Sequence, residues 1–395
     1  MPKENQSKFS FDIRSLVLLM FVIVICIFIG EFSLRSMEAT DRLGFDRLPS
    51  SQDRALSAVD APPGQVRIVG IGDSFTVYRD LQGQNYLRYA QSIAALQANP
   101  LNIVNLSNAG TDLHDYFKNI YMSYDRLKPD IVTIGIYLGN DVARSGPLTL
   151  EQLYNKGKLA ELPENAEKSW QENVKSWFKE SILLNYTFRI LKIYIPVLRS
   201  NQYKNVMNHM SSTFKKDGTF IQAGLSKIDP ELVKLAKSDA INPWDVAMAL
   251  FQPNHYRDLY QLSTKQAVVN FQNMTNDLDF MINWIRGHRM KPLVVLLHPG
   301  IIVGQKYHEY YKRLGITLPD TNSKTLPLTD QIISFLKQRN ILFVDSLPAL
   351  RQEEGNLYIP NDIHLNSEGQ RVVGRLLFDL LKANKLLTKE SFGKN

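Results

Sequence analysis

Cysteine is almost absent from this chain of 395 residues, since its one thiol, Cys26, lies within an apolar run. A single cysteine excludes an intrachain disulfide framework and a cysteine-ligated zinc site. The basic residues, although they give a net charge of +7, form neither arginine-rich blocks nor repeats interleaved with aromatics. Nucleic-acid binding is therefore not expected. Because a P-loop, a complete dinucleotide-binding fingerprint and a cluster of metal ligands are also lacking, the sequence predicts no cofactor and no metal.

Long apolar runs are equally scarce, with one exception near the N-terminus. Residues 16–29 are continuously apolar, and three basic residues precede them. The run is short for a membrane span, but no signal-peptidase site of the Ala-x-Ala type follows it. We interpret residues 15–33 as an uncleaved transmembrane signal anchor, with residues 1–14 in the cytoplasm. The positive charge ahead of the anchor predicts that the rest of the chain is extracytoplasmic, either periplasmic or extracellular.

The remaining chain predicts one α/β domain. Residues 34–64 are polar and contain three prolines, as expected of a linker, and the domain follows over residues 65–395. Short buried strands alternate with amphipathic helices, which indicates a doubly wound parallel sheet. The predicted strands are Val66–Ile71, Ile103–Leu106, Ile131–Leu138, Pro292–Leu297 and Ile341–Val344. The predicted helices are Tyr86–Leu96, Leu113–Leu127, Gln266–His288, Thr329–Arg339 and Ser367–Leu386, with a loop at Leu347–His364.

The alternation stops over residues 146–265, which predict a helical insertion with no convincing strand. Trp170–Phe178, Ile182–Leu198 and Pro243–Phe251 have helical patterns. Ile182–Leu198 is strongly apolar for a surface helix, and packing within its own subdomain is the favoured interpretation. The alternative is a lid or a membrane-facing element, because insertions after strand ends often carry specificity.

Residues with chemistry for acyl transfer follow four strands or loops of this domain. Ser74 follows the first strand, Gly110 the second and Asn140 the third, and Asp362 and His364 lie in the last long loop. A serine hydroxyl becomes a nucleophile when an imidazole removes its proton, and the imidazole needs an acceptor that fixes its tautomer. The simpler alternative is that Ser74 only caps the next helix.

The same blocks resemble a known family of hydrolases. Gly72-Asp73-Ser74-Phe75, Gly110, Gly139-Asn140-Asp141 and Asp362-Ile363-His364 occur in the order typical of the SGNH (GDSL-type) hydrolases. The resemblance covers about residues 66–141 and 292–386. It implies a flavodoxin-like three-layer α/β/α fold and ester hydrolysis or acyl transfer. It also implies Ser74 as nucleophile, His364 as base, and an oxyanion hole formed by Ser74, Gly110 and Asn140.

Two positions depart from the family pattern. Leu138 occupies the usual glycine position of the third block, and Asn361 occupies the usual position of the acid. The available acid is Asp362, two residues before the histidine, which resembles the Asp-x-His form of some membrane-associated glycan acetyltransferase relatives. We expect Asp362 to complete the catalytic triad. The alternative is that a backbone carbonyl orients His364 and that Asp362 is a solvated loop residue.

Several other polar residues lie near the expected site. His298 ends the fourth strand, where it contacts substrate or, as we favour, has a structural role. His114 and Asp112 either line the pocket or open a helix that Asp112 caps. Asp73 and Asp141 are expected to brace loops through hydrogen bonds.

Together these patterns predict a membrane-anchored extracytoplasmic serine esterase with a Ser-His-Asp mechanism. Its expected partners are the membrane and an acyl-ester substrate, for which an envelope glycan or lipid is one candidate; the sequence does not indicate which protein partners it has. The first alternative is an O-acyltransferase, for example one that acetylates a polysaccharide with the same residues. The second is a non-catalytic envelope-binding module, which would have no need of the serine, histidine, asparagine and acid together.

Overall fold

The computed structural model describes residues 64–77, 84–142, 148–157, 202–238, 240–319 and 326–392. All of these belong to one compact unit of the chain. Within these ranges, no helix is both long and apolar enough to cross a membrane. The predicted anchor at residues 15–33 and the predicted helices at 170–178 and 182–198 lie outside the described residues.

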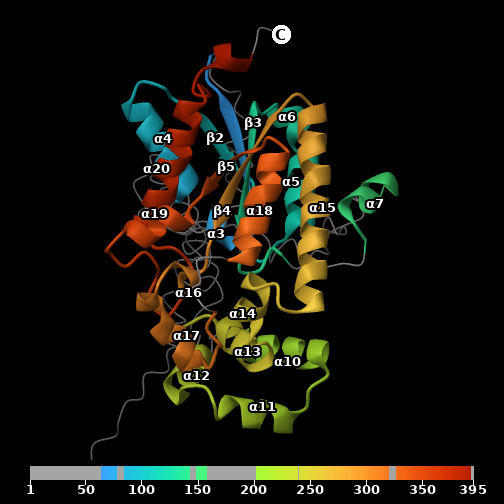
Figure 1. Cartoon of the computed structure of the whole chain (residues 1–395), viewed down its shortest axis with the longest axis vertical. Helices are drawn as coiled ribbons and strands as arrows, with labels where there is room; N and C mark the ends of the chain where they lie inside the picture. Colours follow the sequence, from blue (N-terminus) through green and yellow to red (C-terminus); the bar gives the residue numbers. More distant parts are fainter. Residues whose placement is uncertain are drawn as a thin grey trace, which may run out of the picture. The chain divides into compact units, whose positions relative to one another are not determined.

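A parallel sheet of five strands forms the centre of the fold (Figure 1). The strand order is β2-β1-β3-β4-β5, which is the flavodoxin-like order predicted from the sequence. Nearly every residue of the three central strands is buried, because helices cover both faces of the sheet. The strands are β1 (Arg67–Ile71), β2 (Asn102–Asn105), β3 (Ile131–Tyr137), β4 (Lys291–Leu297) and β5 (Leu342–Asp345).

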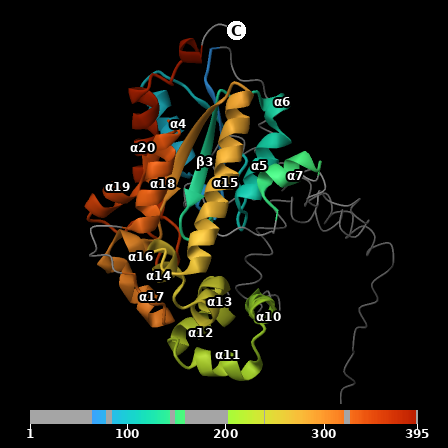
Figure 2. The same ribbon diagram turned by 45° about the vertical axis from the view of Figure 1, so that its right-hand side comes forward.

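Helices on the two faces complete three layers (Figures 1 and 2). One face carries α4 (Tyr86–Leu96) and α20 (Ser367–Ala383), which pack along each other. The other carries α5 (Leu113–Tyr121), α15 (Lys265–Gly287) and α18 (Pro327–Gln338). Right-handed crossovers produce this division, since the chain moves from β1 to β2 in one direction and from β2 through β5 in the other.

The structure corrects two of the expected elements. The predicted helix Leu113–Leu127 is broken at Met122-Ser123, where Ser123 leaves the helical backbone conformation, and a separate α6 (Tyr124–Leu127) follows. The predicted loop Leu347–His364 begins with a short helix, α19 (Leu347–Gln352). A proline in the first turn favours this helix.

The described part of the insertion is helical, as the sequence predicted. Its helices are α7 (Leu150–Asn155), α10 (Gln202–Phe214), α11 (Gly218–Leu225), α12 (Pro230–Lys237), α13 (Pro243–Phe251) and α14 (His255–Tyr260). α10, α11 and α12 pack on α13, whereas α7 packs on α15 and α14 on α18. α13 also packs with α17 (His308–Leu314), which follows β4 and a short α16 (Gly300–Val303). An ion pair of 2.8 Å between Arg313 and Asp229 joins α17 to the start of α12. The sequence analysis had not predicted α16 or α17.

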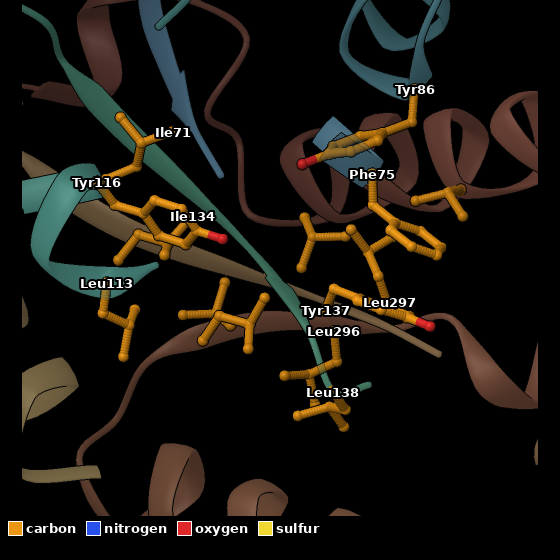
Figure 3. Packing of buried hydrophobic residues seen from close by; sticks show 14 of the residues in the cluster. Ile71, Phe75, Tyr86, Leu113, Tyr116, Ile134, Tyr137, Leu138, Leu296 and Leu297 are labelled. Atoms are coloured by element: carbon orange, nitrogen blue, oxygen red, sulfur yellow. The ribbon is translucent and has the colours of Figure 1, made fainter. Parts of the chain in front are cut away.

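The core extends to the carboxyl ends of the central strands. Phe75 stacks on Tyr137 with ring centroids 3.7 Å apart, next to Leu297 of β4 (Figure 3). Both rings are buried. The apolar core therefore supports the turn that carries Ser74.

Candidate active site

Ser74 lies in a tight turn between β1 and α3 (Ser74–Val77). Asp73 stabilises the turn, because its Oδ1 accepts the backbone N–H of Phe75 at 2.9 Å. Its backbone carbonyl accepts the N–H groups of Thr76 and Val77, both at 3.1 Å. Ser74 is thus the first residue of a one-turn helix at the carboxyl edge of the sheet.

The turn requires a residue without a side chain at position 72. A Cβ on Gly72 would lie 2.2 Å from Thr76 Oγ1 and 3.1 Å from the backbone oxygen of Gly135 on β3. Thr76 is held in place, since its carbonyl accepts hydrogen bonds from the side chains of Asn85 (2.9 Å) and Asn105 (3.0 Å). The contact between Gly72 and Thr76 therefore fixes where α3, and with it Ser74, leaves the sheet.

Ser74, His364 and Asp362 form one continuous chain of hydrogen bonds. His364 Nε2 lies 2.8 Å from Ser74 Oγ, and His364 Nδ1 lies 2.5 Å from Asp362 Oδ1. The same carboxylate oxygen accepts the backbone N–H of His364 at 2.8 Å. In this arrangement Nδ1–H donates to the carboxylate, which leaves Nε2 to accept the serine proton. Asp362 therefore lies beside Nδ1, where a triad acid belongs, although it precedes the histidine by only two residues.

A short hairpin-like loop presents the histidine and the acid. Tyr358 and Leu365 form an isolated antiparallel bridge, and the N–H of Ile359 donates to the carbonyl of His364 at 3.0 Å. The turn between them contains Asn361 in the left-handed region, with φ +58°. Asparagine tolerates this conformation better than most residues with side chains. The departure from the usual acid at position 361 thus coincides with a backbone conformation that suits asparagine.

The carboxylates around the serine differ in their electrostatic environments. Burial would raise the pKa of Asp362, but the hydrogen bonds and charge of His364 outweigh it and hold this pKa below its ordinary value. Burial raises the pKa of Asp73 to about 6, against the opposing effects of the Phe75 N–H, His364 and Asn140. Burial, and then the neighbouring Asp73, raise the pKa of Asp141 well above its ordinary value. Of the three carboxyl groups, the one beside the imidazole is therefore the most readily ionised, as an imidazolium partner requires.

The two other predicted oxyanion donors lie in loops that flank the Ser74 turn. Gly110 follows β2 and Asn140 follows β3, and these strands are the two neighbours of β1. Gly110 has φ +73° and is exposed, and Asn140 is also exposed. Asn108 of the first loop donates its N–H to the carbonyl of Gly72 at 3.1 Å. The strand order thus places the two loops on either side of the Ser74 turn, at the topological switch point where ligands bind in open α/β sheets.

Asp141 braces the third loop. Its Oδ2 accepts the N–H of Tyr137 and the hydroxyl of Tyr116, both at 2.8 Å. A further contact comes from the insertion, where His255 Nε2 lies 2.6 Å from the carbonyl oxygen of Gly139. Burial lowers the pKa of His255, which favours the neutral imidazole with Nε2–H as donor to this carbonyl. Sequence analysis missed this contact, because no motif links His255 to the glycine.

No family model matches this chain, and a search of curated proteins also returned no match. Solved structures do resemble it. A lipase/acylhydrolase from Enterococcus faecalis has 11% sequence identity and a TM-score of 0.38, over 81% of this chain and 96% of the other. A GDSL-like lipase from Bacteroides thetaiotaomicron has 10% identity and a TM-score of 0.36, over 85% and 100%. A catalytic mutant of an acetylxylan esterase from Geobacillus stearothermophilus has 11% and 0.38, over 82% and 96%.

GDSL-type lipases and acylhydrolases are thus among the solved structures that resemble this chain, as its sequence blocks predicted. These similarities have TM-scores below 0.5, so function is inferred from the geometry of the site.

Sequence reasoning also missed two residues that support this geometry. Phe75 packs beside the imidazole of His364, with ring centroids 4.9 Å apart. Gln370 of α20 accepts the N–H of Tyr86 at 2.9 Å and donates to the carbonyl of Phe75 at 3.5 Å.

The other candidate histidines have structural partners. His298 is buried, with Nε2 3.1 Å from Asp345 Oδ1 and Nδ1 3.4 Å from the hydroxyl of Tyr260. His114 Nε2 lies 3.2 Å from Oδ2 of the buried Asp277, which joins α5 to α15. Asp112 caps α5 by accepting the N–H of His114 at 2.9 Å. Among the described residues, no group of three or more histidine, cysteine or acidic side chains could hold a metal ion.

Proposed function

We propose that this protein is an extracytoplasmic, membrane-anchored serine esterase that hydrolyses acyl esters. The hydrogen-bond chain from Ser74 through His364 to Asp362 is the observation that carries this proposal. Nucleophile, base and orienting acid lie within 3 Å of their neighbours, as this chemistry requires.

Acylation begins when Ser74 Oγ attacks the ester carbonyl carbon. His364 Nε2 accepts the serine proton, and the negatively charged Asp362 stabilises the resulting imidazolium. The tetrahedral oxyanion receives hydrogen bonds from the backbone N–H groups of Ser74 and Gly110 and from the Asn140 amide; each such donor is worth about 3 kcal/mol. The ester C–O bond then breaks, and the alcohol leaves with the proton that His364 returns.

Deacylation repeats these steps with a second nucleophile. Water loses a proton to His364 and attacks the acyl-serine carbonyl, and collapse of the intermediate releases the carboxylic acid and regenerates Ser74. A sugar hydroxyl in place of water gives acyl transfer with the same residues. The Asp362-Ile363-His364 spacing favours this second candidate, because it resembles that of membrane-associated glycan acetyltransferases.

The membrane location rests on the apolar residues 16–29 and the basic residues before them. A tether at the cell envelope favours an acylated glycan or lipid as substrate. Fractionation of cells, followed by N-terminal sequencing of the mature protein, tests the anchor. A soluble protein with a new N-terminus would contradict it.

A fluorophosphonate probe and p-nitrophenyl acetate test the catalytic proposal. We expect the detergent-solubilised full chain to be labelled by the probe and to hydrolyse the ester. Both activities should disappear in Ser74→Ala, and turnover should fall to near the background rate in His364→Ala. Ser107→Ala is the matched control, since Ser107 is buried just beyond β2 and has no role in the mechanism. A folded wild-type protein that is neither labelled nor active would instead favour the non-catalytic binding module.

A further inference from the structure

A cavity of about 370 Å³ lies beside the acid of the proposed triad. Its volume is within the range of small-molecule sites, which is about 300–1,000 Å³. Tyr307, Tyr310, Tyr311 and Tyr358 line it. The loop that carries Asp362 and His364 contributes Tyr358, Asn361 and Asp362 to this lining. The cavity is therefore continuous with the catalytic loop, although Ser74 and His364 do not line it.

Hydrogen bonds hold three of the four tyrosine rings in position. Tyr310 donates its hydroxyl to Asp245 of the insertion helix α13 at 2.7 Å, and Tyr358 donates to the carbonyl of His298 at 2.6 Å. The hydroxyl of Tyr307 accepts the N–H of Leu357 at 2.9 Å. Tyr307 and Tyr358 also contact each other edge to face, with centroids 4.7 Å apart. A cavity whose rings are fixed before binding loses little side-chain entropy when a ligand enters.

The fourth ring, that of Tyr311, differs from the other three in its hydrogen bonding. The hydroxyl of Tyr311 is buried and has no hydrogen-bond partner among the residues that the structure describes. A buried hydroxyl without a partner costs about 1–3 kcal/mol. Protein atoms enclose this hydroxyl, so Tyr311 contributes ring surface to the cavity and not its polar tip.

The charges around the cavity select against an anionic ligand. Glu354 and Asp362 contribute acidic side chains to its lining. The one lysine of the lining, Lys306, donates its ammonium to the backbone carbonyls of Glu353 at 2.8 Å and Gly355 at 2.6 Å. Its hydrogen bonds are thus directed at the protein, and the amide side chains of Asn356 and Asn361 supply neutral polar groups.

An acyl tail and a sugar ring are favoured by different kinds of cavity lining. A hydrocarbon tail requires continuous aliphatic surface, whereas hydroxyls, amides and carboxylates next to it would lose water without new hydrogen bonds. A sugar ring has C–H faces that pack on aromatic rings and hydroxyls around its edge that pair with polar side chains. Tyrosines are suited to both, because each combines an apolar ring with a polar tip.

We infer that this cavity binds a neutral sugar ring in the alcohol part of the ester, so that the substrate is an O-acylated carbohydrate and not a lipid. This inference rests on the proposed esterase function and extends it by naming the substrate class and its binding site. The sugar would lie on the Asp362 side of the catalytic loop, and its acyl group would reach Ser74.

A comparison of two acetate esters tests the inference on the detergent-solubilised full chain. Methyl 6-O-acetyl-β-D-glucopyranoside offers a neutral acetylated sugar ring with free hydroxyls, and p-nitrophenyl acetate offers the same acyl group without a sugar. We expect Tyr307→Ala to lower the ratio of kcat/KM for the sugar ester to kcat/KM for the aryl ester at least tenfold. Tyr307→Phe, which keeps the ring, should retain the ratio within threefold. Tyr154→Ala is the control, because this half-exposed ring lies in the aromatic cluster with Phe117.

Two results would overturn the sugar site while leaving the esterase intact. One is an unchanged ratio in Tyr307→Ala. The other is a wild-type preference for p-nitrophenyl palmitate over the acetate that Tyr307→Ala abolishes, which would make the cavity an acyl-chain site.

A binding measurement separates this inference from the catalytic proposal. Saturation-transfer NMR with methyl 6-O-acetyl-β-D-glucopyranoside and the Ser74→Ala protein needs no turnover. We expect a binding signal that disappears in the Ser74→Ala/Tyr307→Ala protein. That result supports the sugar site even if no esterase activity is found, and absence of a signal in Ser74→Ala protein overturns it.

Discussion

Asp362 Oδ1 accepts two hydrogen bonds from His364, one from the ring at 2.5 Å and one from the backbone at 2.8 Å. The second bond fixes the carboxylate against the histidine's own main chain, so a spacing of two residues suffices to orient the ring. The Asp-x-His arrangement is thereby a compact alternative to an acid three residues away.

Asp362→Asn should therefore lower kcat for p-nitrophenyl acetate at least about tenfold, with little change in KM, because an amide at this position no longer favours Nδ1–H and stabilises no imidazolium. Steady-state kinetics measure the effect, and Asp125→Asn, on the exposed side of α6, is the control. A wild-type kcat in Asp362→Asn would contradict this role and would favour the alternative that a backbone carbonyl orients His364.

Asn140 gives a test of the oxyanion hole. Asn140→Ala removes the side-chain donor of the oxyanion hole, so kcat should fall roughly 10²–10³-fold while the protein keeps its fold. Asn140→Asp should be worse, since it places a carboxylate where negative charge develops. Asn99→Ala, at an exposed turn after α4, serves as the control in the same kinetic assay. Equal kcat values in Asn140→Ala and wild type would leave only backbone donors for the oxyanion.

The glycine at position 72 is predicted to matter for stability and for the geometry of the serine. In Gly72→Ala the new methyl group would overlap Thr76 Oγ1. Because two asparagines hold the backbone carbonyl of Thr76, α3 must shift. We expect a loss of about 1–3 kcal/mol in the free energy of unfolding and slower labelling of Ser74 by the fluorophosphonate. Gly287→Ala, at the end of α15, meets no atom within 4 Å and should be neutral or slightly stabilising. Urea unfolding and probe kinetics compare the two, and equal stability of both variants would contradict the steric argument.

Sequence patterns predicted the sheet and the ends of its strands because a buried strand that ends in glycine and polar residues is a local signal. They also singled out Ser74 and His364, 290 residues apart, since each follows a recognisable element. The support around the site was not predictable in this way. His255 of α14 contacts Gly139 in the turn after β3, and Tyr310 of α17 contacts Asp245 of α13; both contacts arise from tertiary packing that no motif marks. Such contacts follow from how the insertion packs, which no periodicity specifies.

Asp245, which takes part in that packing, is expected to make the stability of the protein depend on pH. The residue is only 2% exposed, and burial raises its pKa to about 7. The negative charge of Asp362 acts in the same direction, whereas Tyr310 and His364 oppose it. In the unfolded chain an aspartate titrates near pH 3.9. Between about pH 4 and pH 7 the folded protein therefore retains a proton that the unfolded chain has released.

The sign of the stability change follows from this difference. Because the folded state binds more protons in that window, the free energy of unfolding falls as the pH rises through it, and the effect levels off above about pH 7. Asp245→Asn removes the titration but keeps an oxygen that accepts the Tyr310 hydroxyl. The variant should thus gain stability relative to wild type with rising pH, by at most about 1.4 kcal/mol per pH unit.

Urea unfolding of the detergent-solubilised full chain at pH 4.5, 5.5, 6.5 and 7.5 measures this gain. Asp217→Asn is the control, since hydrogen bonds from the Phe220 N–H and the Thr219 side chain lower the pKa of Asp217 and place its titration below the window. Its difference from wild type should be the same at all four values. A constant difference for Asp245→Asn as well would mean that Asp245 is already ionised in the folded protein at pH 4.5, and that the buried Tyr310–Asp245 contact stabilises a carboxylate throughout.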